Sequence, residues 1–173
     1  PKPQEERQMK KLLFVVDPLD QIKVNKDTTF SIMREAQWRG YLIAACLPQD
    51  IQWKSGGFVM ATVQQISLTG SQPGWYRVHN TMRMALKDFD AVLMRKDPPF
   101  NAEYIYATHL LEQAEREDGN VVNRPRALRD HPEKLAIMEF PELVPPTLVT
   151  LNAASVPDFH AKHDDIILKP QEG

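Results

Sequence analysis

The residues best suited to chemistry are three charged side chains that follow one apolar segment. Arg95, Lys96 and Asp97 come directly after the run 91–94, and two prolines then end the segment. An arginine can hold a carboxylate through two parallel hydrogen bonds, whereas a lysine acts as a compact point charge. The pattern therefore favours a carboxylate-binding site. The alternative is a solvated loop in which a cation pairs with Asp97, and spacing alone does not separate the two.

Polar side chains also follow two other segments that are expected to be strands. Asp17 comes after the apolar run 12–16, and Asn123 and Arg124 come at the end of the segment 120–123. In an open parallel sheet, ligands collect beyond the carboxyl ends of the strands. We therefore expect these side chains to gather at the same edge of the sheet as the first cluster.

Two lysines further along the chain could bind phosphate. Lys134 stands early in an expected helix, and Lys169 ends an Ile-Ile-Leu segment. Two ammonium groups that converge could neutralise phosphate oxygens. On spacing alone, the plainer interpretation that each is a surface lysine is favoured.

Other reactive residue types have plainer explanations. His160 and His163 are three residues apart and could share a metal, but no further ligand cluster supports this, so a solvated helix face is favoured. Cys46 lies in an apolar segment and is expected to be a core thiol. The sequence contains no G-x-G-x-x-G or Walker-type phosphate loop.

The first part of the chain predicts a strand–helix–strand unit that would position Asp17. The apolar segment 11–17 predicts a strand, and the segment 41–47 predicts a second one. Asp27 or Thr28 can cap the helix between them, and Gly40 can end it. Such a unit should be a right-handed parallel crossover.

The middle of the chain adds further strands and one long helix. Segments 51–54 and 58–68 flank Ser55-Gly56-Gly57, which is typical of a hairpin. The remaining expected elements are a short strand at 75–78, a strand at 91–94, a helix at 102–115 and a short strand at 120–123. Together these predict an α/β fold with an open, mainly parallel sheet and a hairpin insertion.

The character of the chain changes after residue 125. Asp130 followed by Glu133 predicts a helix start, and segments 147–151 and 165–169 predict strands with a short helix between them. We expect a polar N-terminal extension at 1–11, an α/β domain at 12–125, and the beginning of a second domain at 126–173. This last part is too short to be a comfortable independent domain.

Composition excludes several functional classes. The net charge of −2 and the lack of a basic block argue against nucleic-acid binding. The longest aliphatic runs, such as 12–16, are too short to span a membrane, and the polar N-terminus shows no secretory signal. The single cysteine, Cys46, cannot form an internal disulfide, which fits a reducing compartment. We expect a cytoplasmic location.

A series of short motifs runs through the chain from about Leu12 to Pro170. They are DP at 17–18, KDTTF at 26–30, EAQ at 35–37, MRKDPPF at 94–100, EYIYAT at 103–108, VNRP at 122–125, LRD at 128–130, EKL at 133–135, TLVT at 147–150 and IILKP at 166–170. In this order and spacing they resemble the prokaryotic glutathione synthetases, although the hairpin region diverges.

The resemblance implies an enzyme that joins γ-glutamylcysteine and glycine to form glutathione, with ATP converted to ADP and phosphate through an acyl phosphate. It implies an N-terminal domain of the pre-ATP-grasp type, followed by the start of an ATP-grasp domain. It also implies Mg²⁺ as a cofactor and a homo-oligomeric assembly.

By matching position, Lys134 and Lys169 would bind ATP. The side chains that face the dipeptide substrate would be Arg95, Lys96, Asp97 and Asp17.

One departure from the family pattern concerns the end of the chain. The family continues after Lys-Pro with Leu-Asp-Gly and further glycines that cover the phosphates, whereas Pro170 is followed here by Gln171-Glu172-Gly173. We therefore expect the chain to be an incomplete fragment that is inactive alone, with its magnesium ligands elsewhere. The alternative is a non-catalytic small-molecule-binding or subunit-interface module.

Overall fold

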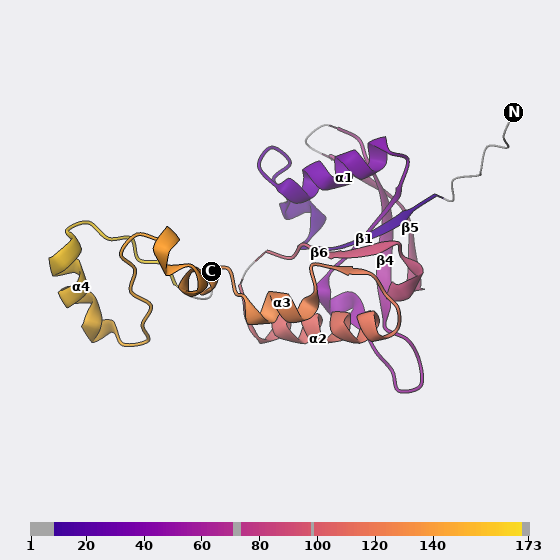
Figure 1. The fold of residues 1–173 in the computed structure, drawn as a ribbon. Coiled ribbons are helices and arrows are strands. Elements are labelled where there is room, and N and C mark those ends of the chain that lie inside the picture. The colour runs from indigo at the N-terminus through magenta and orange to yellow at the C-terminus, as the bar shows by residue number, and fades with distance from the viewer. Residues whose placement is uncertain (1–8, 71–73, 98, 171–173) are drawn as a thin grey trace, which may run out of the picture.

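A mixed β-sheet with helices on both faces forms the body of the protein (Figure 1). The computed structural model describes residues 9–70, 74–97 and 99–170. Pro98, most of the expected N-terminal extension, and the Gln171-Glu172-Gly173 end lie outside the described residues. Among the described residues the sheet has seven strands in the order β3-β4-β2-β1-β6-β7, with β5 paired to β4.

The strands have the following bounds. They are β1 (Lys11–Val15), β2 (Leu42–Cys46), β3 (Ile51–Gln52), β4 (Met60–Leu68), β5 (Tyr76–Ala85), β6 (Ala91–Met94) and β7 (Val121–Val122). The β1–β2, β1–β6 and β6–β7 pairs are parallel, whereas the β2–β4, β3–β4 and β4–β5 pairs are antiparallel.

Helices cover both faces of this sheet, and α4 (Val156–His163) lies apart from it in the C-terminal segment (Figure 1). The α-helices are α1 (Thr28–Trp38), α2 (Ala102–Arg116), α3 (Pro125–Asp130) and α4 (Val156–His163). Short 3-10 turns are η1 (Leu19–Gln21), η2 (Pro48–Asp50), η3 (Leu86–Asp88), η4 (Ala136–Glu139), η5 (Pro141–Leu143) and η6 (Ala153–Ser155). Figure 1 shows α1 above the sheet and α2 and α3 below it. No helix in the described part of the chain is long and apolar enough to cross a membrane.

Strand β1 divides the core into two halves because successive side chains of a strand point to opposite faces. Leu13 and Val15 are fully buried in the cluster that includes α2. Phe14 and Val16 are buried in the cluster beneath α1. The apolar run 12–16 is uninterrupted because both faces of this strand are covered by other parts of the core.

Helix α1 begins and ends where the sequence predicts. The Asp27 side chain caps it by accepting a hydrogen bond from the backbone N–H of Thr29 at 2.7 Å. At the other end Gly40 adopts φ 76°, and the N–H of Tyr41 donates to the carbonyl of Ala36. This Schellman ending needs a left-handed residue, which glycine provides without strain.

The sheet differs from the expected, mainly parallel one. The α/β class is confirmed, but parallel and antiparallel pairs are mixed, so a predominance of parallel pairs is not confirmed. Strand β4 presents one edge to both β2 and β3 and its other edge to β5. Strand β5 extends over 76–85, well beyond the short segment expected there, because it pairs with the whole length of β4.

The segment after β7 departs most from expectation. The helix predicted to begin at Asp130 is wrong, because α3 begins at Pro125 and ends at Asp130. A proline disfavours helical backbone in the residue before it, and Pro132 follows His131 at φ −124° and ψ 65°. The short helix expected after Asn152 is confirmed as η6 and α4.

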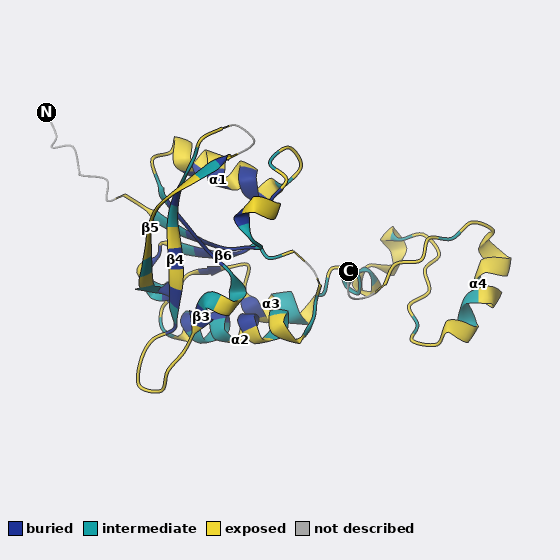
Figure 2. Ribbon diagram, turned by 180° about the vertical axis from the view of Figure 1, so that it is seen from behind, coloured by how far each residue is buried: buried dark blue, intermediate teal, exposed yellow. Residues whose placement is uncertain are grey.

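The two strands expected around that helix are also absent. Residues 147–151 and 165–169 form no strand in the described structure, where no sheet strand pairs with them. A strand is stable only beside a hydrogen-bonding neighbour. Figure 2 shows this part of the chain largely exposed, with Leu143, Leu151, Ile167 and Leu168 each more than two-thirds accessible.

The end of α2 provides a test of how the chain sets its helix boundaries. Asp118 takes the left-handed position there, at φ 68°, and the N–H of Gly119 donates to the carbonyl of Ala114. We expect Asp118→Gly to raise the free energy of unfolding by about 0.5–1 kcal/mol, because relief of left-handed strain exceeds the added entropy of the unfolded chain.

The reciprocal variant is Gly40→Ala, which places a side chain at the matching position of α1. It should lower the free energy of unfolding by about 0.5–1 kcal/mol. Urea unfolding of both variants beside the parent measures the two shifts. A lower midpoint for Asp118→Gly would contradict the strain argument.

Candidate functional site

The carboxyl ends of β1 and β6 bring the charged clusters of the sequence together. The two strands are parallel with Val15 beside Met94, and the N–H of Arg95 donates to the Val15 carbonyl at 2.8 Å. The next residues therefore leave the sheet side by side. Asp17 and Asp97 follow at this edge, 80 residues apart in the sequence.

Asp17 connects two of the expected site residues. Its Oδ1 lies 2.7 Å from Nζ of Lys96, and its Oδ2 accepts a hydrogen bond from the N–H of Asp97 at 2.9 Å. Lys96 also donates to the Asp97 carbonyl. The lysine charge is thus compensated within the protein, and the Asp17 carboxylate holds the turn that follows β6.

Arg95 points the other way, toward the start of α1. Its Nε donates to Oγ1 of Thr29 at 3.1 Å, and one Nη donates to Oγ1 of Thr28 at 2.7 Å. The ion pair with Asp97 that was the plainer alternative does not form among the described residues. A guanidinium has five N–H donors, so these two bonds orient the group and leave donors for a ligand.

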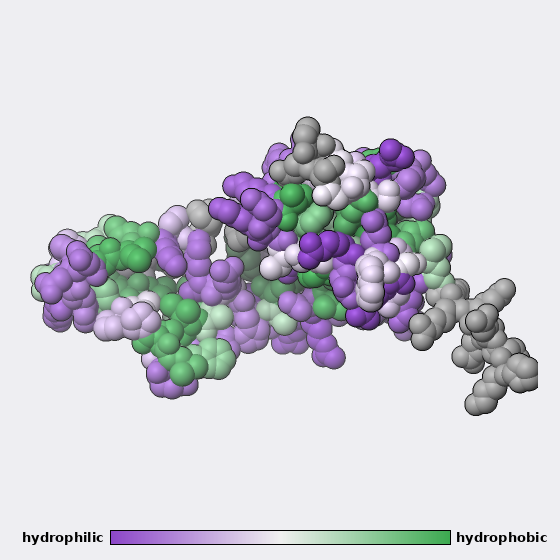
Figure 3. Space-filling model, turned by 90° about the horizontal axis from the view of Figure 1, so that it is seen from above, coloured by the Kyte–Doolittle hydropathy of each residue, from purple (hydrophilic) through white to green (hydrophobic). Residues whose placement is uncertain are grey.

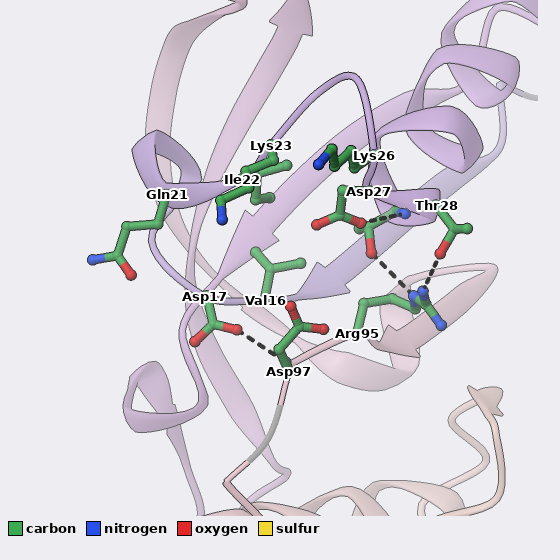
Figure 4. A pocket seen from close by; sticks show the side chains of 11 residues that line it. Val16, Asp17, Gln21, Ile22, Lys23, Lys26, Asp27, Thr28, Arg95 and Asp97 are labelled. Carbon is green, nitrogen blue, oxygen red and sulfur yellow. Dashed lines mark hydrogen bonds between the residues drawn. The ribbon is translucent and has the colours of Figure 1, made fainter. Parts of the chain in front are cut away.

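A first cavity, which we call the loop cavity, lies between the loop that follows β1 and the end of β6 (Figure 4). Its volume is about 520 Å³. It is lined by Val16, Asp17, Gln21, Ile22, Lys23, Lys26, Asp27, Thr28, Thr29, Arg95 and Asp97. Lys23 and Lys26 were not among the predicted site residues, although Lys26 stands in the KDTTF motif.

A second cavity, which we call the edge cavity, lies where β6 and β7 end and the chain continues past α3. Its volume is also about 520 Å³. It is lined by Met94, Arg95, Lys96, Asp97, Phe100, Tyr104, Asn123, Leu128, His131, Pro132, Glu133, Lys134 and Leu135. Arg95 and Asp97 line both cavities, so the two spaces adjoin at the end of β6.

The two candidate phosphate-binding lysines have different surroundings. Lys134 lines the edge cavity and donates a hydrogen bond from Nζ to the carbonyl of Pro170. Lys169 is exposed and lines neither the loop cavity nor the edge cavity. The segments that carry the two lysines therefore meet, while the convergence of both ammonium groups on one ligand stays a prediction.

A charged contact between helices positions the wall that carries Lys134. Arg129 of α3 forms an ion pair with Glu112 of α2, and its Nη1 donates to Oγ1 of Thr108 at 3.2 Å. The hydrogen bond from Arg129 lowers the pKa of Glu112 below its ordinary value. The sequence offered no signal for this contact, because it joins residues 17 and 21 positions apart.

His131 adds a titratable group to the edge cavity. Its Nδ1 lies 2.5 Å from Oε1 of Glu139, and this hydrogen bond raises the pKa of the imidazole above its ordinary value. His160 and His163 lie on exposed α4. Within the described ranges no three His, Cys, Asp or Glu side chains are grouped as metal ligands.

Comparison with known proteins identifies two family matches. Residues 10–129 match the family described as prokaryotic glutathione synthetase, N-terminal domain. Residues 133–173 match the family described as prokaryotic glutathione synthetase, ATP-grasp domain.

Curated relatives agree with these matches. The chain is 48% identical over 163 residues to a glutathione synthetase of Ralstonia nicotianae, which covers 94% of this chain and 50% of the relative. It is 48% identical over 166 residues to the glutathione synthetase of Nitrosomonas europaea, and the match covers 94% of this chain and 52% of that relative. For the glutathione synthetase of Vibrio cholerae the identity is 46% over 165 residues, and the match covers 95% of this chain and 52% of that relative. The chain thus spans about half the length of these relatives.

The ion pair between His131 and Glu139 predicts how the His131 ring titrates. In an NMR pH titration, the His131 ring should show a pKa above the usual value of about 6.5, and Glu139→Gln should lower it. The pKa is raised in the folded state, so the contribution of the pair is fully present below the unfolded pKa. That contribution is lost as the pH rises through the folded value.

Glu142→Gln serves as the matched control, because Glu142 is an exposed carboxylate three positions from Glu139 in the sequence and forms no hydrogen bond with His131. It should leave the titration of His131 where it is in the parent. Equal effects of the two substitutions would show that general charge, rather than the hydrogen bond, shifts the pKa.

Proposed function

The chain belongs to the prokaryotic glutathione synthetase family, and we propose that it is the N-terminal part of an enzyme that joins γ-glutamylcysteine to glycine at the expense of ATP. The structural observation that carries this proposal is the edge cavity, where Arg95 and Lys134 line one space. A cation for the substrate carboxylate and a cation for ATP phosphate must lie close together for a phosphoryl group to pass between them.

The proposed reaction has two steps. The cysteinyl carboxylate of the dipeptide attacks the γ-phosphorus of ATP, forming an acyl phosphate and releasing ADP. The amine of glycine then attacks the acyl carbon, and inorganic phosphate leaves as the amide bond forms. Positioning and charge neutralisation supply most of the catalysis of such transfers, which suits a site rich in arginine and lysine.

The proposed substrate side consists of Arg95, Lys96, Asp97 and Asp17. Arg95 contacts the dipeptide, because its guanidinium is oriented by two threonine hydroxyls and keeps donors for a carboxylate. Lys96 and Asp17 neutralise one another and hold the backbone of Asp97. Their contribution is mainly to fix the edge of the cavity against which the dipeptide lies.

The proposed ATP side consists of Lys134 and Lys169. The match of residues 133–173 to an ATP-grasp domain supports ATP as the phosphoryl donor. The hydrogen bond from Lys134 to the Pro170 carbonyl supports the approach of the two segments. We propose that both ammonium groups bind phosphate oxygens of ATP.

Other parts of the proposal rest on the family. Mg²⁺ would neutralise phosphate charge, and its ligands would lie outside this chain, since the described residues offer no grouped set. We further propose a homo-oligomer in the cytoplasm and a first domain of the pre-ATP-grasp type.

We also propose that residues 126–173 begin the ATP-grasp domain. Apolar side chains of this segment, including Leu151 and Ile167, are exposed, and Figure 3 shows hydrophobic surface over the C-terminal part of the chain. A contiguous exposed apolar surface is costly in water unless another element covers it. The remaining half of the parent polypeptide would supply that cover.

Arg95→Lys in the complete enzyme tests the substrate side. Because lysine cannot reproduce two parallel hydrogen bonds to a carboxylate, the KM for γ-glutamylcysteine should rise about tenfold to a hundredfold. The KM for ATP should stay the same. Steady-state kinetics with each substrate varied in turn measures both values.

The control for this variant is Arg34→Lys, on the exposed face of α1 and outside both cavities. It should change neither KM. If Arg95 only ties the start of α1 to β6, Arg95→Lys should instead lower the melting temperature and leave the KM for the dipeptide unchanged. That result would end the substrate-binding assignment.

The isolated 173-residue chain should not form glutathione. We expect no ADP release that depends on γ-glutamylcysteine and glycine, because the residues that hold Mg²⁺ and cover the phosphates are proposed to lie elsewhere. A coupled ADP assay, on material whose intact mass matches the chain, measures this beside the complete enzyme. Dependent ADP release by the fragment would contradict the domain assignment.

A further inference from the structure

We propose that the loop cavity binds the amino-acid head group of the γ-glutamyl substrate, with Lys23 and Lys26 holding its α-carboxylate and Asp97 facing its α-ammonium. This inference rests on the proposed function and adds a second subsite to it. The reacting carboxylate of the dipeptide would lie in the edge cavity, and the opposite end of the same molecule would lie in the loop cavity.

The backbone that carries the two lysines is fixed before any ligand arrives. Leu19 and Ile22 are buried in the core beneath α1, and Nε1 of buried Trp75 donates to the Leu19 carbonyl at 3.1 Å. The N–H groups of Lys26 and Asp27 both donate to the Lys23 carbonyl at 2.9 Å. A loop anchored in this way loses little backbone entropy on binding.

The lysine ammonium groups are available to a ligand. Lys23 and Lys26 are exposed residues that line the cavity, and no hydrogen bond or ion pair joins either side chain to another described residue. In Figure 4 their side chains extend over the hollow on the side opposite Asp97. Neither ammonium group is therefore accounted for by a contact within the described protein.

The loop cavity contains both positive and negative side chains, which favours a ligand that carries one charge of each sign. Its three cationic side chains are accompanied by the carboxylates of Asp17, Asp27 and Asp97. The charge of Asp17 is neutralised by Lys96, so the carboxylates of Asp27 and Asp97 remain, one on each side of the cavity. A triphosphate would meet like charges at close range, whereas an α-amino acid group carries one charge of each sign.

The carboxylates of Asp27 and Asp97 are not equivalent. Asp27 uses Oδ1 to cap α1 at the N–H of Thr29. The carboxylate of Asp97 has no hydrogen-bond or ion-pair partner among the described residues, while its backbone N–H is held by Asp17. Asp97 is accordingly the carboxylate that can accept the ammonium group without giving up a structural bond.

The adjoining cavities set the direction of the dipeptide. Arg95 and Asp97 line both spaces, so a ligand can extend from one into the other past the end of β6. Phosphoryl transfer requires the cysteinyl carboxylate to lie near Lys134, which lines only the edge cavity. The free α-amino acid group, at the far end of the substrate, then falls in the loop cavity.

The test combines a double variant with a trimmed substrate in the complete enzyme. Lys23→Met/Lys26→Met should raise the KM for γ-glutamylcysteine about tenfold or more, because charge-assisted hydrogen bonds to the α-carboxylate are lost. The analogue 4-aminobutyrylcysteine lacks that carboxylate, so the same variant should leave its KM unchanged. The KM for ATP should also be unchanged.

Two further variants sharpen the test. Lys10→Met/Lys54→Met removes two exposed lysines that line neither cavity, and it should behave as the wild type with both dipeptides. Lys23→Arg/Lys26→Arg keeps the charges and should recover most of the affinity for γ-glutamylcysteine. Melting curves of all variants confirm that they are folded.

The outcomes distinguish this inference from the proposed function. If the wild-type enzyme forms glutathione and the methionine double variant raises the KM for both dipeptides equally, or for neither, the loop cavity is not the head-group subsite. A rise in the KM for ATP alone would assign the lysines to phosphate and overturn the inference. A complete wild-type enzyme that forms no glutathione would overturn the proposed function, and this inference with it.

Discussion

The parallel pairing of β1 with β6 is the contact on which the rest of the site depends. It continues to the hydrogen bond between the N–H of Arg95 and the carbonyl of Val15, so two chain segments leave the sheet together. Each segment carries charged residues, and this pairing brings together in space side chains that lie far apart in the sequence. Because alternate side chains of β1 are buried in two different core clusters, a slip in its register would disrupt the packing of both, and this fixes where the two charged segments leave the sheet.

Helix α1 supplies the second constraint. Thr28 and Thr29 hold the guanidinium of Arg95, while Asp27 holds the first turn of the helix itself. Asp27, Thr28 and Thr29 therefore begin the helix and line the loop cavity, and the two threonines also orient the Arg95 guanidinium. A substitution at this point would be expected to affect stability and binding together, which is why kinetics and melting curves must be read side by side.

The contact between α2 and α3 determines where the C-terminal segment departs. Arg129 and Glu112 hold α3 against α2, and the chain then turns at Pro132 to bring Lys134 to the edge cavity. Beyond this point the chain has exposed apolar residues and no strand in the described ranges. Residues before this point thus form most of the lining of the edge cavity, and the segment after it has no buried side chains among the described residues.

Local pattern alone determined the elements whose stability is largely local. Examples are the strand at 91–94, the Asp27 cap and the Gly40 ending of α1, because apolar runs and capping chemistry act over a few residues. The gathering of polar residues at one edge also followed from the parallel unit. The strands expected at 147–151 and 165–169 failed because a strand requires a neighbour, which local sequence does not specify. Only the tertiary structure decided that Arg95 bonds two threonines rather than Asp97, and that Lys23 and Lys26 line a cavity. Those contacts join residues more than 60 positions apart, and their partners are chosen by the packing of the sheet and α1.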